Sequence, residues 1–151
     1  MNNDKQKPSN PKDSVGIKRV PFSTVPAVPI AEIGLAMLEG ALKYGRHNYR
    51  AVGVRSSVYY DAAMRHLTRW WEGEDIDPDS GLPHIIKCLA SLIVLRDAQI
   101  NNMLTDDRPP ACPEWATKLN EMALKMIEEY PGEPKEAFTK DWKNEKGVSS
   151  G

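Results

Sequence analysis

The sequence predicts an all-α fold, and two observations carry this prediction. Apolar residues recur at helical spacing in four stretches, at 29–44, 56–72, 82–99 and 114–130, and this periodicity is the main sequence signal for helices. No stretch of any length alternates apolar and polar residues as a half-buried strand does. The chain has 151 residues, which is enough for one domain with its own core.

The segment before the first helix falls into two parts. Residues 1–14 are polar, basic and proline-containing, and this composition predicts a flexible arm. Residues 15–29 hold Val, Ile and Phe but are interrupted by Pro21, Pro26 and Pro29. Because proline disfavours helix at its own position and at the one before it, we expect an extended segment that lies against the core.

Glycines and serines mark the ends of the first two helices. Gly45 follows the first helix and Gly73 the second, as expected of residues that stop helices. Ser56 or Ser57 is expected to cap the second helix at its N-terminus. The third helix is apolar around most of its circumference, which predicts burial on several sides. One small bundle gives such a helix too little cover, so we expect a homo-oligomer.

The chain is therefore expected to have three segments. Residues 1–14 are the arm, residues 15–105 the helical domain, and residues 106–151 a C-terminal helix with a loose tail. The stretch TDDRPPACP at 105–113 separates the last two, because its prolines interrupt helices.

Composition excludes several functional classes. The 20 basic and 21 acidic residues leave a net charge of −1, so the chain is not built to coat nucleic acid or an anionic membrane. Cys88 and Cys112 are isolated, which disfavours a disulfide framework or a structural zinc site and fits a reducing compartment. No apolar run approaches the roughly 20 residues that span a bilayer. We expect a cytoplasmic protein.

Residues 43–79 carry a sharp inversion of charge. Six bases share the first part with a single acid, Asp61; they are Lys43, Arg46, Arg50, Arg55, Arg65 and Arg69. Five acids follow with no base among them: Glu72, Glu74, Asp75, Asp77 and Asp79. Guanidinium groups bind phosphate and carboxylates hold hard cations, so the two blocks predict a nucleoside triphosphate bound with Mg²⁺. The alternative is two solvated surfaces of opposite charge.

Two histidines stand out in the helices. His66 shares a face with Trp70, and the simplest interpretation is a histidine satisfied within the core. His84 opens the apolar third helix directly after the acidic loop, and Cys88 and Ser91 continue a narrow polar stripe from it. Such a stripe either lines a pocket or permits close helix packing, and both interpretations stay open.

A second group of polar residues lies on the first helix. Glu32 and Glu39 are two turns apart and share a face, with Lys43 one turn further. The Glu39–Lys43 pair alone is ordinary for a helix surface. If this face turns inward, the two carboxylates could hold a metal or activate water. The chain lacks P-loop, GxGxxG, HExxH and Ser-His-Asp patterns, so water is the expected nucleophile.

Three strings of the sequence resemble one known family. They are NPKDSVGIKRVP at 10–21, KYGRHNYR at 43–50 and RHLTRWWEGEDIDPDSGLPH at 65–84. Together they resemble a phage family of dATP/dGTP diphosphohydrolases over about residues 8–108. That family is similar to the MazG and dimeric dUTPase type, whose all-α helical bundles are usually oligomeric. Those enzymes use Mg²⁺ or Mn²⁺ to hydrolyse a nucleoside triphosphate to the monophosphate and pyrophosphate.

The resemblance implies a function and a cofactor. We expect hydrolysis of dGTP or dATP to the monophosphate and pyrophosphate with Mg²⁺ or Mn²⁺, in a MazG-like bundle with an extended N-terminal segment. In some phages such an enzyme supplies dGMP for the synthesis of 2-aminoadenine DNA, and the resemblance implies the same role here.

The site residues follow from the resemblance together with the charge pattern. The MazG type has an ExxE pair on one helix and an ExxD pair on a later one, and neither occurs here in clean form. His84 and Lys87 stand where the later pair is expected. Either the metal lies closer to the acidic loop, or His84 contacts the metal or the substrate.

The expected residues are assigned to three roles. The metal ligands are Glu32, Glu39, Glu74 and Asp77. The catalytic residues are Glu39, Asp77 and His84. The substrate contacts are Lys43, Tyr44, Arg46, Asn48, Arg55, Arg65 and Trp70.

Two other functions are compatible with the sequence. An HD-type hydrolase that releases triphosphate would use His66, His84 and nearby aspartates, but the chain has no His-Asp dipeptide. A nucleotide-binding or helical interaction module without catalysis would use the charge blocks in an oligomer interface. Partners other than a purine dNTP and further copies of the chain are not expected.

Overall fold

The computed structural model describes residues 9–142, which are mainly helical. In chain order the elements are α1 (Pro11–Gly16), the 3₁₀ turn η1 (Phe22–Thr24), α2 (Ala27–Tyr44), α3 (Asn48–Ala51), β1 (Val54–Arg55), α4 (Ser56–Trp71), α5 (His84–Ile100), β2 (Leu104–Thr105) and α6 (Trp115–Glu128). The four helices predicted from apolar spacing are confirmed, with ends within about two residues of those expected.

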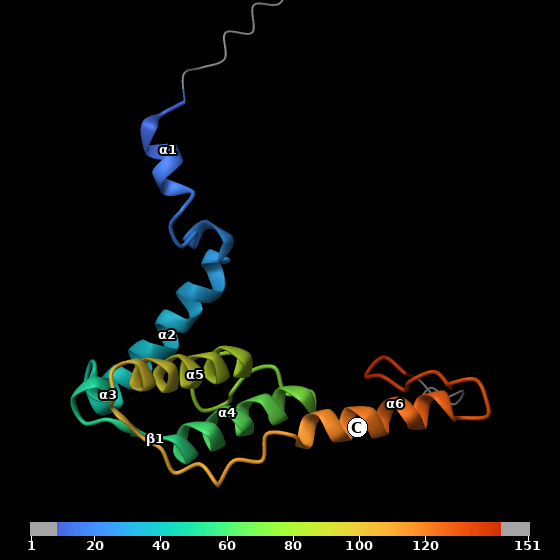
Figure 1. The fold of residues 1–151 in the computed structure, drawn as a ribbon. Coiled ribbons are helices and arrows are strands. Elements are labelled where there is room, and N and C mark those ends of the chain that lie inside the picture. Colours follow the sequence, from blue (N-terminus) through green and yellow to red (C-terminus); the bar gives the residue numbers. More distant parts are fainter. Residues whose placement is uncertain (1–8, 143–151) are drawn as a thin grey trace, which may run out of the picture.

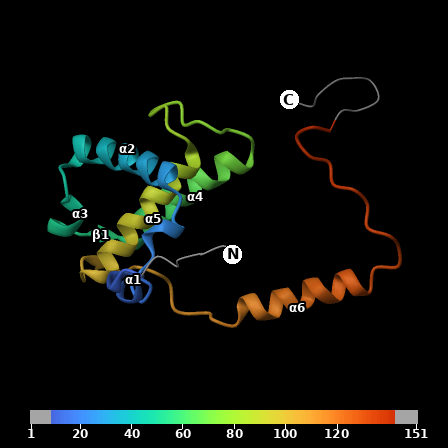
Figure 2. The same ribbon diagram turned by 90° about the horizontal axis from the view of Figure 1, so that it is seen from above.

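Helix α5 is the centre of the fold. It packs against α4 along its length and against α2 (Figures 1 and 2). One core cluster joins Ala36 of α2 to Ile86 and Ala90 of α5. A second joins Val94 and Ala98 of α5 to Val54 and to the half-buried Met37 and Tyr59. The small side chains let helices approach closely, and the predicted burial of α5 on more than one side is confirmed.

The helix caps differ from those expected from the sequence. Gly45 ends α2 with φ of 90°, a conformation that favours glycine, as predicted. The N-cap residues of α4 and α5, Arg55 and Pro83, make no side-chain capping bond, so the expected cap by Ser56 or Ser57 was wrong. Asp107 takes this role at α4: the Ser57 backbone N–H and hydroxyl donate to its carboxylate, at 2.9 and 2.5 Å.

The N-terminal segment is more helical than predicted. Residues 11–16 form α1, because the Asn10 side chain accepts from the Lys12 N–H and Pro11 occupies the first helical position. The expected extended segment at 15–29 is also wrong, since it holds η1 and the start of α2. Its apolar side chains do not pack on the core, and Ile17 and Phe22 are about four-fifths exposed. Residues 1–8 of the expected arm lie outside the described residues.

A short parallel strand pair closes the far end of the α4–α5 hairpin. Val54 pairs with Leu104 and Arg55 with Thr105. Gly53 precedes the pair with φ of 85°, and a Cβ there would lie 2.6 Å from the Met103 carbonyl oxygen. Two residues are too few to give an alternating pattern, so the sequence carries no signal for this pair, and the fold remains mainly helical.

The fourth predicted helix, α6, extends away from the other helices (Figures 1 and 2). Its apolar residues remain exposed, among them Trp115, Leu119 and Met122. Within residues 9–142 no helix is both long and apolar enough to cross a membrane.

Candidate functional site

The loop between α4 and α5 folds back on itself and presents a buried carboxylate. The Asp77 N–H donates to the Leu82 carbonyl at 2.9 Å, and the Gly81 N–H donates to the Asp77 carbonyl at 2.8 Å. The Ser80 hydroxyl donates to Asp77 Oδ2 at 2.6 Å. The Asp77 side chain is therefore fixed in place, although it lies in a loop.

Asp77 lines a small polar pocket, which we call the charged pocket. Its volume is about 270 Å³. Residues from α2, α4, α5 and the acidic loop line it: Glu39, Lys43, Arg65, His66, Arg69, Asp77, Asp79 and Lys87. Four bases and three carboxylates thus converge with one histidine. The two charge blocks of the sequence meet here, together with Glu39 of α2 and Lys87 of α5.

Glu39 holds two lysines at this pocket. Its carboxylate accepts from Lys43 Nζ at 2.5 Å and from Lys87 Nζ. These hydrogen bonds, that of Lys43 first, lower the pKa of Glu39 against the opposing effect of burial. The same bond raises the pKa of Lys43. A carboxylate with a lowered pKa is a poor base, so the geometry suits Glu39 to orienting the lysines.

His66 and His84 contact each other beneath the charged pocket. Their Nδ1 atoms are 2.8 Å apart, so one ring donates and the other accepts. His84 is completely buried, and its backbone N–H donates to the Asp75 carbonyl at 3.0 Å. Its Nε2 makes no hydrogen bond within residues 9–142 and lies 3.6 Å from Glu74 Oε1.

The pKa of His66 is shifted by its surroundings. Burial lowers it most, and the positive charges of Lys87 and Arg69 and the neighbouring His84 add to this effect. The negative charge of Asp77 opposes it. The net result is a lowered pKa, so His66 is neutral at neutral pH and able to accept a proton.

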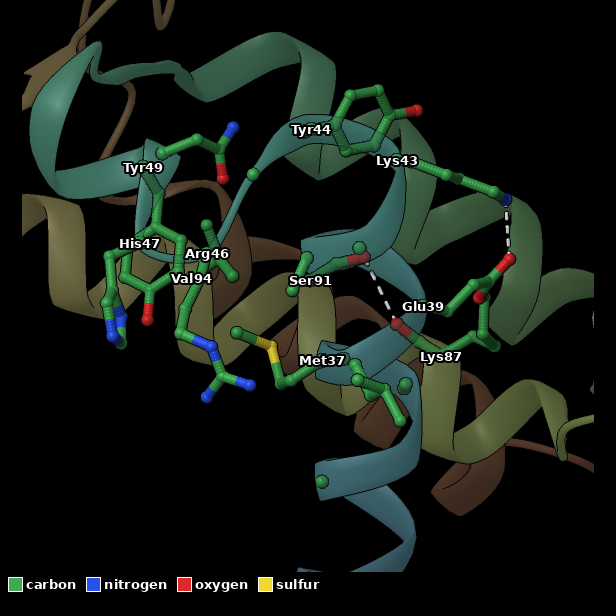
Figure 3. Close-up of a pocket in the computed structure, with 18 of the residues that line it drawn as sticks. Met37, Glu39, Lys43, Tyr44, Arg46, His47, Tyr49, Lys87, Ser91 and Val94 are labelled. Carbon is green, nitrogen blue, oxygen red and sulfur yellow. Dashed lines mark hydrogen bonds and ion pairs between the residues drawn. The ribbon is translucent and has the colours of Figure 1, made fainter.

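A larger pocket adjoins the charged pocket, and we call it the aromatic pocket. Its volume is about 600 Å³. Three tyrosines, Tyr44, Tyr49 and Tyr59, line it. Glu39, Lys43 and Lys87 line both pockets. In Figure 3 these three charged residues lie at one end of the cavity, while Arg46, His47 and Tyr49 lie at the other. The two pockets are therefore neighbours that share these three charged side chains.

The structure brings together many of the residues expected from the sequence. Glu39, Lys43, Arg65 and Asp77 line the charged pocket. Lys43 also lines the aromatic pocket, with Tyr44, Arg46 and Asn48. His84 lines neither pocket and reaches the charged pocket only through His66.

Four other expected residues lie elsewhere. Glu32 and Trp70 line neither pocket, and the Trp70 ring lies beside that of Trp71. Arg55 forms an ion pair with Asp107 at 3.7 Å. Glu74 faces His84 from the loop and is itself partly exposed.

The structure does not assemble the expected metal ligands into one centre. In the part of the chain that it describes, no group of three or more His, Cys, Asp and Glu side chains is close enough to hold a metal ion. The Glu39 carboxylate already accepts hydrogen bonds from Lys43 and Lys87. These residues do not fit a resident metal centre.

Sequence reasoning did not assign Lys87, Arg69, His66 and Asp79 to the site. Lys87 is a lone charge in the apolar stretch of α5, and this was the available signal. The pairing of His66 with His84 joins residues 18 positions apart across two helices, and no spacing rule along one helix could show it.

Comparison with known proteins identifies the family of the chain. A family model described as "dATP/dGTP diphosphohydrolase, N-terminal" matches residues 9–108, and every residue of both pockets lies within that range. No curated protein and no solved structure matches the chain. Nucleotide hydrolysis is the activity that the family description names. The match covers about two thirds of the chain, which therefore belongs to the dATP/dGTP diphosphohydrolase N-terminal family.

Proposed function

We propose that this protein hydrolyses dGTP or dATP to the deoxynucleoside monophosphate and pyrophosphate. The observation that carries the proposal is the junction of a pocket with four bases and a tyrosine-lined pocket, inside the region that matches the family. A basic pocket beside an aromatic one suits a molecule with one anionic end and one aromatic end.

The triphosphate would occupy the charged pocket. Lys43 and Lys87 stand at the junction of the two pockets, where the phosphates nearest the sugar would lie. Arg65 and Arg69 lie beyond them on α4 and could contact the outer phosphates with charge-assisted hydrogen bonds. Fixed positive charges of this kind stabilise the charge that develops on a departing pyrophosphate.

The purine and the sugar would occupy the aromatic pocket. Its volume of about 600 Å³ falls within the range of about 300 to 1,000 Å³ that is usual for small-molecule sites. Tyrosine rings offer flat apolar surfaces for a base. The Asn48 side chain can both donate and accept hydrogen bonds at a base edge.

A divalent cation would belong to the substrate. Mg²⁺ or Mn²⁺ carried on the triphosphate needs only one or two protein carboxylates and would supply further charge neutralisation, and the Asp79 carboxylate, which lines the charged pocket, would be one such contact. The residues of the chain bind the phosphates, exclude water from the apolar end and direct the attacking water to the α-phosphorus.

The test is a product assay with purified protein, each dNTP and NTP, and Mg²⁺ or Mn²⁺, resolved by ion exchange. We expect monophosphate and pyrophosphate from dGTP or dATP. Nucleoside and triphosphate would indicate the HD-type reaction instead. Nucleotide binding without any product would indicate a binding module and would overturn the proposal.

We also propose that the chain self-assembles, as MazG-type bundles do. One face of α2 exposes Val28, Leu35 and Leu42, and one face of α5 exposes Leu92 and Ile93. Exposed apolar side chains that share one helix face commonly mark an interface between proteins. Light scattering after size exclusion should give a mass at least twice the 16.9 kDa of one chain. A monomer at about 100 µM would contradict self-assembly, and Leu42→Glu should reduce the mass if this face forms the contact.

The proposed activity has a biological corollary. If dGTP is the preferred substrate, the product is dGMP, and we propose that the protein supplies it for synthesis of 2-aminoadenine DNA in a phage-infected cell.

A further inference from the structure

The contact between the two histidine rings constrains where their protons lie. A hydrogen bond between two Nδ1 atoms needs one protonated nitrogen and one lone pair. Two neutral arrangements satisfy this need. In the first, His84 donates to His66, and in the second, His66 donates to His84.

The first arrangement leaves the buried side of His84 unsatisfied. Neutral His84 would then carry a lone pair on Nε2. That atom has no donor within the described residues and lies 3.6 Å from the Glu74 carboxylate. Two electron-rich groups would face each other without a proton between them, in a place where a buried polar atom needs a partner.

The second arrangement places a proton between His84 Nε2 and Glu74 Oε1, which lie 3.6 Å apart, just beyond hydrogen-bond distance. The His66 Nδ1–H donates to His84 Nδ1, and the His84 Nε2–H points toward Glu74 Oε1. A doubly protonated His84 would instead place a full charge at a completely buried position, which is costly. The second arrangement is therefore the favoured one, and it leaves His66 Nε2 with a lone pair.

The position of His66 makes this lone pair available to the charged pocket. Its Nδ1 faces the interior and His84, so Nε2 is the ring nitrogen available to the charged pocket that His66 lines. Burial lowers the pKa of His66, and of the charged groups around it only Asp77 opposes that effect, while Lys87 and Arg69 reinforce it.

We propose that His66 is the general base of the hydrolysis proposed above, and that His84 and Glu74 are positioning residues that keep its Nε2 unprotonated toward the charged pocket. The inference rests on the proposed function. His66 Nε2 takes a proton from water as the water oxygen forms a bond to the α-phosphorus. The bond from the α-phosphorus to its bridging oxygen breaks, and the electron pair leaves with pyrophosphate.

His66→Ala is the direct test of the base. We expect kcat for dGTP or dATP to fall by at least about a hundredfold, with KM changed by only a few-fold. Added imidazole should restore part of the activity in the variant and should not accelerate the wild type. Unchanged kcat, or a folded variant that imidazole does not rescue, would overturn the assignment.

Glu74→Gln tests the positioning role without altering the pocket. Glu74 is partly exposed and lines neither pocket, so we expect the variant to fold. Loss of the carboxylate removes the preference for the productive tautomer, and kcat should fall about tenfold with KM unchanged. Glu74→Asp should recover part of the loss. Glu72→Gln, in the same loop, is the matched control and should behave as wild type; an equal effect there would contradict the role.

A third measurement needs no turnover. ¹⁵N NMR of the full-length wild type, labelled at its three histidines, should show His66 protonated at Nδ1 and His84 at Nε2. The reverse tautomers would overturn the positioning role of His84 and Glu74 even if the enzyme is active. A wild type that hydrolyses no nucleotide would overturn the proposed function itself, so the two failures are distinguishable.

Discussion

Lys87→Met is expected to lower kcat/KM for the preferred dNTP by at least about a hundredfold. The Lys87 ammonium stands where the two pockets meet and is held there by Glu39. Removing a fixed charge aimed at a reacting phosphate typically costs a hundredfold to a thousandfold in rate. Methionine keeps the length and much of the packing of the side chain. Steady-state kinetics on the purified variant would measure the effect.

The division between kcat and KM will show what Lys87 does. A rise in KM alone would mean that Lys87 binds the substrate and the transition state equally, whereas a fall in kcat means that it acts in the transition state. Lys125→Met on α6 is the matched control, since Lys125 is an exposed lysine in an i,i+4 pair with Glu129. Activity of Lys87→Met within about threefold of wild type would place the triphosphate elsewhere.

Asp77→Ala is expected to reduce both stability and activity. The Asp77 carboxylate is buried and accepts from the Ser80 hydroxyl and the Asp79 N–H. Loss of hydrogen bonds to a charged group should lower the free energy of unfolding by about 2 kcal/mol. The loop that Asp77 anchors also carries Glu74 and the Asp75 carbonyl, which hold His84. A loosened loop should therefore lower kcat by at least about a hundredfold.

Ser80→Ala separates the two effects of Asp77. It removes the hydroxyl that donates to the carboxylate but leaves the charge in the pocket. We expect it to cost about 1 kcal/mol of stability and only a few-fold in kcat. If Asp77→Ala and Ser80→Ala prove equal in both measurements, the carboxylate has no role beyond its bond to Ser80.

The stability that Asp77 contributes should also depend on pH. Burial is the largest single influence and raises its pKa, but the bonds from Ser80 and Asp79, together with the charges of His66 and Lys87, outweigh it, so the pKa lies below its ordinary value of 3.8. The unfolded chain then binds a proton more readily than the folded one, and acid favours unfolding. Thermal unfolding of wild type and Asp77→Ala should differ by a constant free energy between about pH 5 and 7. The difference should shrink as the pH falls through the folded pKa, below 3.8.

The parts of the fold that were predictable are those with a local signal. The helices at α2, α4, α5 and α6 follow from spacing within each segment. The strand pair joins Val54 to Leu104, 50 residues apart, and two residues carry no period. Helix α1 did have a local signal, the Asn10 cap before Pro11, but the polar composition of the arm was given more weight.

The sequence predicted which kinds of charged group form the site better than it predicted which residues supply them. The basic and acidic blocks do meet, through Arg65 and Asp77. The basic block spans a helix end, a loop and a second helix, so its members point in different directions. Arg50 turns to Asp97, with two bonds of 2.9 and 2.7 Å, and Arg55 turns to Asp107. Sequence gives the charge of such residues but not the partner that each one finds.

The Asp107 carboxylate marks the end of the unit that carries the site. It binds the start of α4 through Ser57 and lies near Arg55, and the family match ends one residue later. Among the described residues beyond that point, up to residue 142, no side chain lines either pocket. The Asp107 carboxylate thus ties the chain after α5 back to the start of α4. Helix α6 lines neither pocket, so a chain that ends before it should keep the walls of both.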